Sequence, residues 1–536
     1  VIIGNEAGHD ITSTVEVVLI GSYAGSKLNS GDADGTVAIG MNALSTATDA
    51  QRNVMIGYEA GVKLKTDDNV AIGFRAMRNI GDTAGSSHGE NNIAIGTFAL
   101  GGGDSSTYAN NTGHKNIAIG HQALGNGHST AFTAYENVAI GHNVMNYGGN
   151  MVSSVAIGSN TGLYATGSYN TFVGAEAGKG GTTSAPYSSG QYNVAIGTEA
   201  LKGFTTANRM VAIGYEAMTD TTTGQDSIAI GYQAAYYSTG SYSVTVGMNA
   251  GLRSGPYNVY IGYNAGSNTK GANSNVAVGQ KAMWANAGDQ NVAIGNTAGE
   301  QFRGTESTAV GSQAGRHATG SYNTFVGMSA GYGGTTSAPY SSGQSNTALG
   351  YEALKGFTTA GANVAIGYES AKSITAGSSN IVLGYNTLPT ATTATRNIFI
   401  GRNAGEDIPA GQAVSDCVVI GYEAFKGNGS TTTGAQYTIA IGNSAAKQIT
   451  TGAGNTAIGA STLEELHTGA YNTAVGHQAM DRLENAAGSN NNTALGYNAM
   501  GGIWAGDSDD NVAIGKSAMA GALNDGNYNI AIGTNA

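Results

Sequence analysis

The sequence predicts an all-β fold, a parallel β-solenoid or β-roll of about thirty short coils. The first observation behind this is a motif of Asn, a β-branched residue, Ala, an aliphatic residue, Gly, two variable residues and Ala, with clean copies at 69–73, 137–141, 291–295 and 511–515. The second is the spacing of the motif glycines, about 15 to 17 residues through the middle of the chain. That period is too short for a helix pair or a propeller blade, but it suits one coil of a solenoid with short strands and tight turns.

The three residues before each motif glycine predict a short strand. The position three before the glycine is Val, Ile or Thr, and the position one before it is aliphatic, as in Ile72, Ile140, Ile196 and Ile294. Such residues favour a pleated backbone, and because the two positions are two residues apart they share a face. We expect this face to fill the inside of each coil with an aliphatic ladder.

The strand-centre position, between these two, points the other way. It is Ala in about two-thirds of the copies, and a small apolar residue there indicates that the second face is also buried. It could lie against another wall of the same coil, or at a subunit interface around an axis, which we favour. The interface is expected to widen where a bulky residue replaces Ala, at Phe172, Tyr260, Phe325 and Phe399.

Three further columns predict the ladders and corners of the coil. Asn recurs four residues before the glycine, and stacking at ~4.8 Å would form amide ladders of Asn69, Asn137, Asn193 and Asn291. The motif glycines are expected at tight corners with positive φ; they include Gly73, Gly141, Gly197, Gly295, Gly367 and Gly515. The residue four after the glycine alternates between Gly and a bulky apolar residue, which predicts two ways of turning the second corner.

The motif Asn-Val-Ala-Ile-Gly-x-x-Ala resembles the YadA-type head repeats of trimeric autotransporter adhesins, and related runs occur in phage tail-fibre proteins. The resemblance covers essentially all 536 residues. It implies a left-handed parallel β-roll, three chains around one axis and a role in surface attachment. The adhesin coil is shorter and more uniform than this one, and the sequence contains no stalk, anchor or chaperone segment that would separate an adhesin from a phage fibre.

Residues 1–536 are expected to form one continuous solenoid, and because the chain opens and closes inside a repeat we interpret it as a fragment of a longer protein. A long segment occurs twice, at 161–206 and 314–360, which indicates a duplicated block. Insertions in solenoids often carry binding sites. Longer connections occur at 79–90, 101–115, 125–136, 179–192, 332–345, 406–415 and 426–437. Tyr187, Tyr192 and Tyr340 in two of these are candidate contacts to a sugar or a protein, the alternative being plain solvated loops.

Composition and charge exclude several classes of function. The net charge of −12 disfavours non-specific nucleic-acid binding, and no apolar run approaches the ~18 residues of a membrane span, so no membrane insertion is expected in this segment. The single cysteine, Cys417, is expected to fill the asparagine column as a small residue and not to act as a nucleophile.

No motif indicates an enzyme, a cofactor or a metal site. The run 174–180 has the wrong spacing for a phosphate loop, and the acidic turns at 32–35 and 507–510 lack the closing Glu of a calcium loop. His114, His121 and His128 recur at seven-residue steps, which is not a zinc spacing.

These observations predict a structural, non-enzymatic segment of an extracellular fibre that mediates or presents surface adhesion, on a cell or a virion. Its expected partners are itself, as a homotrimer, and a host-surface glycan or protein. Two alternatives stay open: a virion tail-fibre shaft, and a single-chain solenoid that is the subunit of an extracellular filament or matrix.

Overall fold

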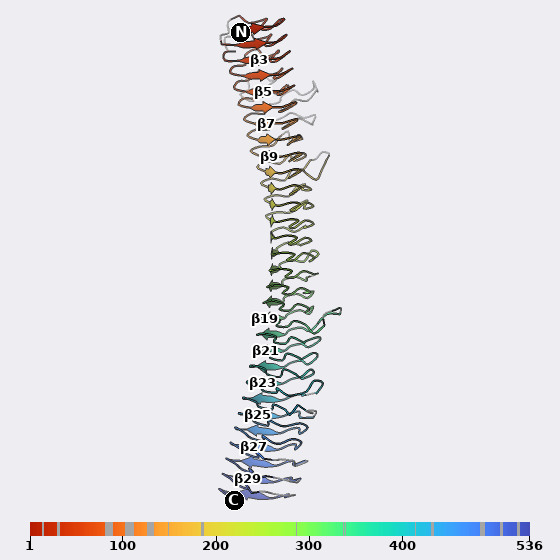
Figure 1. Ribbon diagram of the computed structural model, residues 1–536, viewed down its shortest axis with the longest axis vertical. Helices are drawn as coiled ribbons and strands as arrows, with labels where there is room; N and C mark the ends of the chain where they lie inside the picture. The colour runs from red at the N-terminus through yellow and green to blue at the C-terminus, as the bar shows by residue number, and fades with distance from the viewer. Residues whose placement is uncertain are drawn as a thin grey trace. The chain divides into compact units, whose positions relative to one another are not determined.

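Each part of the chain folds as a stack of short coils, seen edge-on in Figure 1. The computed structural model describes all residues except 13–15, 29–32, 81–88, 102–111, 126–132, 148–149, 184–186, 286, 336, 338, 413, 430–433, 483–487, 504–506 and 522–525. The described residues contain thirty strands and no helix. They form two compact units, Val1–Asn273 and Ser274–Ala536, and each is a parallel β-solenoid, as predicted.

Each strand is two or three residues long. The strands of the first unit are β1 (Ile2–Ile3), β2 (Val18–Ile20), β3 (Val37–Ile39), β4 (Val54–Ile56), β5 (Val70–Ile72), β6 (Ile93–Ile95), β7 (Ile117–Ile119), β8 (Val138–Ile140), β9 (Val155–Ile157), β10 (Thr171–Val173), β11 (Val194–Ile196), β12 (Val211–Ile213), β13 (Ile228–Ile230), β14 (Val244–Val246) and β15 (Val259–Ile261). Those of the second are β16 (Val276–Val278), β17 (Val292–Ile294), β18 (Thr308–Val310), β19 (Thr324–Val326), β20 (Thr347–Leu349), β21 (Val364–Ile366), β22 (Ile381–Leu383), β23 (Ile398–Ile400), β24 (Val418–Ile420), β25 (Ile439–Ile441), β26 (Thr456–Ile458), β27 (Thr473–Val475), β28 (Thr493–Leu495), β29 (Val512–Ile514) and β30 (Ile530–Ile532).

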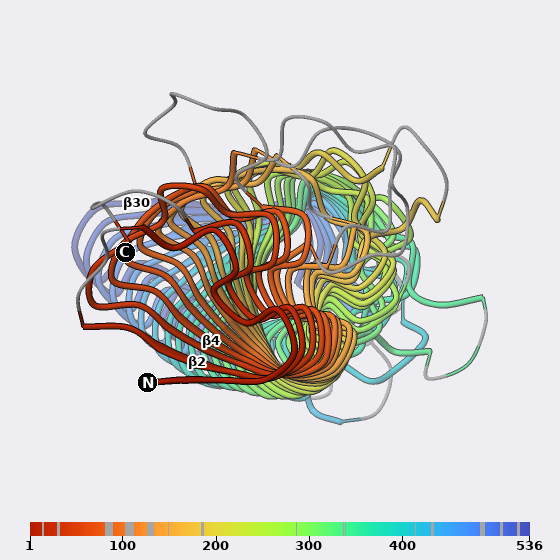
Figure 2. The ribbon, with the colours of Figure 1, turned by 90° about the horizontal axis from the view of Figure 1, so that it is seen from above.

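Within a unit, each strand pairs in parallel with the strand of the next coil. The register keeps the repeat aligned, so that Val194 faces Val211 and Ala195 faces Ala212 across β11 and β12. Seen from above in Figure 2, consecutive coils nearly overlie one another. Every column of the repeat therefore becomes a ladder that runs from coil to coil.

The strand-centre residue, and not its neighbours, faces the inside of the coil. Ala195 and Ala293 are completely buried, whereas Ile196 and Ile294 beside them are each 39% exposed. The predicted aliphatic ladder inside the coil is therefore wrong, and so is the placement of the Ala column at a subunit interface. The coil is narrow, and its opposite wall approaches the strand so closely that a methyl group fills the space in most coils.

The bulky strand-centre residues also lie inside the coil, so the prediction that they widen an interface is wrong. Phe172 and Phe325 are completely buried, and both lie over a glycine four residues after their own motif glycine. A Cβ on Gly178 would lie 2.5 Å from the Phe172 ring, and one on Gly331 would collide with the Phe325 ring. Tyr260 meets Gly266, and Phe399 meets Gly405, in the same way.

The second corner has one backbone conformation and not two. Its φ is 59° at Gly61, 52° at Leu201 and 55° at Met218, all in the left-handed region. The residue type at this corner changes the volume inside the coil, while the turn itself stays the same.

The motif glycines have two physical reasons to be glycine. As predicted, their φ is positive, 137° at Gly73 and at Gly295 and 132° at Gly515, where a side chain is strained. In addition, a Cβ on Gly73 would lie 2.6 Å from the carbonyl oxygen of Gly96 in the next coil. The coils therefore touch at this column, backbone against backbone.

The asparagine column forms the predicted amide ladder. The backbone N–H of Asn92 donates to Oδ1 of Asn69 at 2.9 Å, and Nδ2 of Asn92 donates to the same oxygen at 3.1 Å. Nδ2 of Asn116 also donates to the carbonyl oxygen of Ala134, three residues before the next Asn of the column, at 2.8 Å. Asn69, Asn92 and Asn116 are completely buried, so the ladder satisfies polar groups that have no access to water.

Candidate binding surfaces

The strand face of each unit is an exposed aliphatic surface. The columns one and three residues before the motif glycine point outward, and because the coils are in register they form two parallel ladders. The first ladder is aliphatic throughout, and the second is Val or Ile interrupted by Thr in seven of the described strands. The most exposed members, from a third to a half accessible within β5 to β29, are Ile72, Ile93, Ile95, Ile157, Ile196, Ile228, Ile230, Ile261, Ile294, Leu349, Ile381, Leu383, Ile420, Ile439, Ile458, Leu495 and Ile514.

An aromatic column follows directly after the motif glycine. Tyr351, Tyr368 and Tyr385 stack face to face in three successive coils, with ring centroids 5.0 and 4.9 Å apart. The Arg402 guanidinium lies 5.5 Å from the centroid of the Tyr385 ring. These rings extend the apolar surface beside the strand face while their edges remain accessible.

A second exposed column, five residues before the motif glycine, pairs its members from coil to coil. Arg209 Nε donates to Asp226 Oδ1 at 2.6 Å, and Arg396 Nε donates to Asp416 Oδ1 at 2.7 Å. Tyr192 belongs to this column and stacks on Tyr169 at 4.9 Å. The candidate Tyr192 therefore contacts its neighbour along the stack, with its remaining surface exposed.

The other two candidate tyrosines pack onto the walls of their coils. The rings of Tyr187 and Tyr164 stack in parallel with their centroids 6.1 Å apart, and burial raises the pKa of the Tyr187 phenol. Tyr340, its counterpart in the duplicated block, stacks on His317 at 5.8 Å. The predicted connections at 79–90, 101–115 and 125–136 lie largely outside the described residues.

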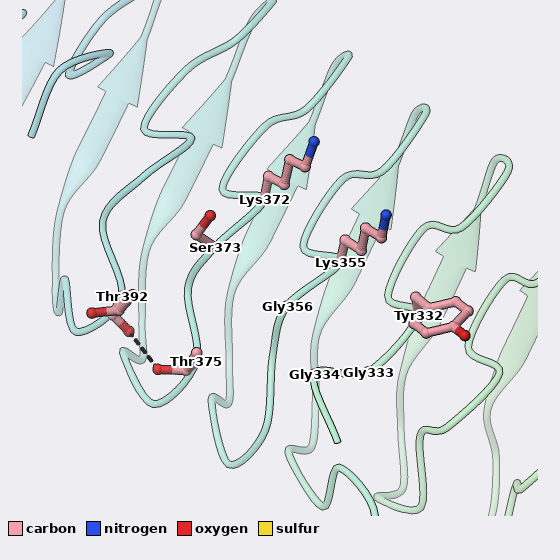
Figure 3. Close-up of a pocket in the computed structure, with 9 residues that line it drawn as sticks. All are labelled: Tyr332, Gly333, Gly334, Lys355, Gly356, Lys372, Ser373, Thr375 and Thr392. Atoms are coloured by element: carbon pink, nitrogen blue, oxygen red, sulfur yellow. Dashed lines mark hydrogen bonds between the residues drawn. The ribbon is translucent and has the colours of Figure 1, made fainter. Parts of the chain in front are cut away.

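A groove crosses the return segments of the second unit, meaning the residues five to nine positions after each motif glycine. Figure 3 shows part of it, a cavity of about 440 Å³ lined by Tyr332, Gly333, Gly334, Lys355, Gly356, Lys372, Ser373, Thr375 and Thr392. A second cavity of about 430 Å³ shares Ser373 and Thr392 and continues past Thr390 to Asp407 and Pro409. The strands contribute none of these lining residues.

Sequence reasoning missed this groove. The usable signal was a run of small residues at one column, six positions after the glycine, where Gly333, Gly356 and Ser373 follow one another in three coils. Tyr340 lies close to one end of it, because His317 beneath its ring approaches the Tyr332 hydroxyl to 3.3 Å.

The cations at the groove are neutralised by a ladder of carboxylates. Lys355 Nζ lies 2.6 Å from Glu352 Oε1, and Lys372 Nζ lies 2.7 Å from Glu352 Oε2 and 3.1 Å from Glu369 Oε1. The hydrogen bond to Glu352 raises the pKa of Lys372. Lys372 therefore stays charged, and because Glu352 and Glu369 pair with the two lysines, the groove carries little net positive charge.

The cysteine and the histidines that the sequence offered as candidates for catalysis or metal binding pack against neighbouring coils where the structure describes them. Cys417 occupies the asparagine column, where its N–H donates to Asn397 Oδ1 at 3.0 Å, and burial raises its thiol pKa to about 11. His121 stacks on His142 at 5.2 Å, His114 stacks on Tyr135 at 5.0 Å, and His128 lies outside the described residues. Among the residues that the structure describes, no group of three or more His, Cys, Asp or Glu side chains could hold a metal ion.

No helix in the described part of the chain is long and apolar enough to span a bilayer. Comparison with known proteins gives no match to a family model, to a curated protein or to a solved structure.

Proposed function

We propose that this chain is a structural segment of a trimeric extracellular fibre, carried on a cell or a virion, that presents a surface for attachment. The observation that carries the proposal is the exposed aliphatic strand face. Monomeric proteins rarely expose a continuous apolar surface of more than a few hundred Å², and a larger one indicates an interface. The resemblance of the repeat to adhesin head repeats supports a trimer in particular.

The two outward columns are suited to packing against copies of themselves. Their residues are short, aliphatic in one column and Val, Ile or Thr in the other. The backbone beneath them pairs from coil to coil within the sheet, and the aromatic column lies beside them as a rim. Three identical faces can meet around a three-fold axis, which closes the assembly and leaves none of them exposed. The proposed interface therefore lies on the aliphatic and Thr residues of these two columns, with the Ala column inside each coil.

The mass in solution tests this assembly. We expect light scattering to give three times the 53.8 kDa of one chain, constant through a dilution series. The triple variant Ile294→Lys, Val310→Lys, Val326→Lys places charges on the outward face of β17 to β19 and should reduce the mass toward that of one chain, with the β circular dichroism signal kept. The matched control is Gln290→Lys, Glu306→Lys, Tyr322→Lys in the same coils, in the column that elsewhere holds Lys115, and it should remain trimeric.

Two results would contradict the trimer. A wild-type mass of one chain at all concentrations would mean that the aliphatic face is tolerated in water. A mass that grows with concentration would favour the subunit of a filament.

A further inference from the structure

We propose that the groove on the return segments of the second unit, between Tyr332 and Pro409, binds a linear, uncharged oligosaccharide lying along the stack of coils. This inference rests on the proposed role in attachment, and it assigns the ligand class and the site. The groove is a continuous hollow formed by two cavities of about 440 and 430 Å³ that share Ser373 and Thr392. It crosses the coils that follow β19 to β24, so an occupant must be elongated.

The spacing of the groove matches a sugar chain. Neighbouring coils lie ~4.8 Å apart, the spacing of paired strands. A hexopyranose in an extended glycan has nearly the same length, so that successive sugars would meet equivalent positions of successive coils. The floor of the groove contains the small residues Gly356 and Ser373, on which the face of a sugar ring can lie. Thr375 and Thr392 lie at one side of it (Figure 3).

The hydrogen bonding of the groove disfavours a peptide. The backbone N–H of Gly356 donates to Lys372 O at 2.7 Å, and that of Thr375 donates to Thr392 O at 2.9 Å. These donors are used between coils and cannot pair with an added strand. The Thr375 hydroxyl also donates to Thr392 O, at 3.1 Å, but its oxygen still has lone pairs that can accept from a sugar hydroxyl.

The charges of the groove disfavour a polyanion. Lys355 and Lys372 share Glu352, and Lys372 also contacts Glu369, so each positive charge is balanced at the groove wall. Asp407 at the far end is likewise paired, with Lys426 Nζ 3.6 Å from its Oδ2, and the whole chain carries a net charge of −12. An uncharged glycan meets no such electrostatic cost.

The first unit offers a matched comparison. In the duplicated block, the first unit has Lys179 where the second unit has Tyr332. In the coil that follows the block, the first unit has Thr219 and Asp220 where the second unit has Lys372 and Ser373. The two regions share a backbone pattern and differ at the floor and one wall of the groove. Variants can therefore be placed at equivalent columns of both units.

The test fills the groove without changing the coil. Ser373→Tyr places a ring over the floor, and the same column already holds Tyr237 in the first unit, where its ring is exposed. The control is Asp220→Tyr at the equivalent position of the first unit. Binding of β-1,4-linked glucose and N-acetylglucosamine hexamers to the full chain is measured by titration calorimetry, with polygalacturonate as the anionic probe.

We expect at least one neutral hexamer to bind, Ser373→Tyr to weaken it at least about tenfold, and Asp220→Tyr to leave it within about twofold. Thr375→Val should weaken binding more than Thr222→Val, its counterpart in the first unit. The proposal is overturned if neither hexamer binds, if polygalacturonate binds more tightly than both, or if the two tyrosine variants behave alike. Light scattering on the same samples distinguishes failure of this proposal from failure of the trimer. If a monomeric chain binds the hexamer in the groove, the trimer is overturned and the glycan site is not.

Discussion

At the strand centre, the volume of one side chain is matched by its partner across the coil. Ala195 faces a coil whose second corner holds Leu201, whereas Phe172 faces Gly178, and φ at the two corners is nearly equal, 52° and 53°. In these two coils the interior is filled from opposite walls, by Leu201 in one and by Phe172 in the other. This is the close packing of protein cores. Where both positions are small, as at Ala293 and Gly299, a third residue, Phe302, fills the space.

Variants in the coil of β10 test whether the strand-centre residue and the second-corner residue are matched in volume. Phe172→Ala should destabilise the protein by about 3–5 kcal/mol because it leaves a cavity. Gly178→Leu should cost about 1–3 kcal/mol because Leu collides with the ring. The double variant recreates the Ala–Leu pair of the next coil, so its loss should be clearly smaller than the sum, as measured by denaturant unfolding. Additive losses would show that the two sites are independent.

Cys417 interrupts the asparagine ladder between Asn397 and Thr438. Asn at this position can donate from Nδ2 to Asn397 Oδ1 and to Ala435 O, which the Cys417 thiol reaches at 3.4 Å. We expect Cys417→Asn to stabilise the protein by about 1 kcal/mol, the net value of one added buried hydrogen bond. Cys417→Ala, which removes the thiol and adds no partner, is the control and should be less stable than wild type in the same unfolding experiment.

At the scale of the element, the turns after several strands carry ion pairs that run along the stack. Lys202 Nζ lies 2.7 Å from Glu176 Oε2 in the preceding coil and 3.2 Å from Glu199 Oε2 in its own. Lys447 Nζ lies 2.8 Å from Glu423 Oε2 in the preceding coil. These turns are thereby tied to their neighbours by side chains as well as by the backbone.

This ladder gives stability a defined pH dependence. The hydrogen bond from Lys202 lowers the pKa of Glu176, and that from Lys447 lowers the pKa of Glu423. Because the folded pKa lies below the unfolded one, the contribution is present above pH 4.5, the unperturbed glutamate pKa, and is lost as the pH falls through the folded value.

We therefore expect the free energy of unfolding to fall between pH 5 and pH 3. The pairs are partly exposed, so each should contribute only about 0.2–1 kcal/mol. The double variant Glu176→Gln, Glu423→Gln should be less stable than wild type at pH 7 and should show a shallower fall. An identical pH profile for variant and wild type would show that the ladder does not contribute.

At the scale of the whole molecule, stability is a sum of coils and of contacts between neighbours. Parallel pairing joins each coil to the next in register, and the long-range contacts within a unit are of this kind. A defect in one coil should therefore be felt locally, as in other solenoids.

Limited proteolysis tests this locality. Phe172→Ala lies in the first unit, and we expect cleavage sites mapped by mass spectrometry to increase near β9 to β11 while the pattern in the second unit stays unchanged. Phe325→Ala in the second unit is the reciprocal control. Simultaneous loss of protection in both units would indicate a cooperative transition of the whole chain instead.

The sequence by itself determined the coil, its period, the strands, the asparagine ladder and the positive φ of the motif glycines, because each follows from local residue chemistry repeated at a fixed spacing. Alternation showed that Val and Ile share a face, but not which face is inside. The tertiary structure decided this, since the opposite wall of the coil leaves room for Ala195 and not for Ile196. It also decided the groove, because Gly356, Ser373 and Thr392 belong to three successive coils and share one hollow only after those coils have stacked.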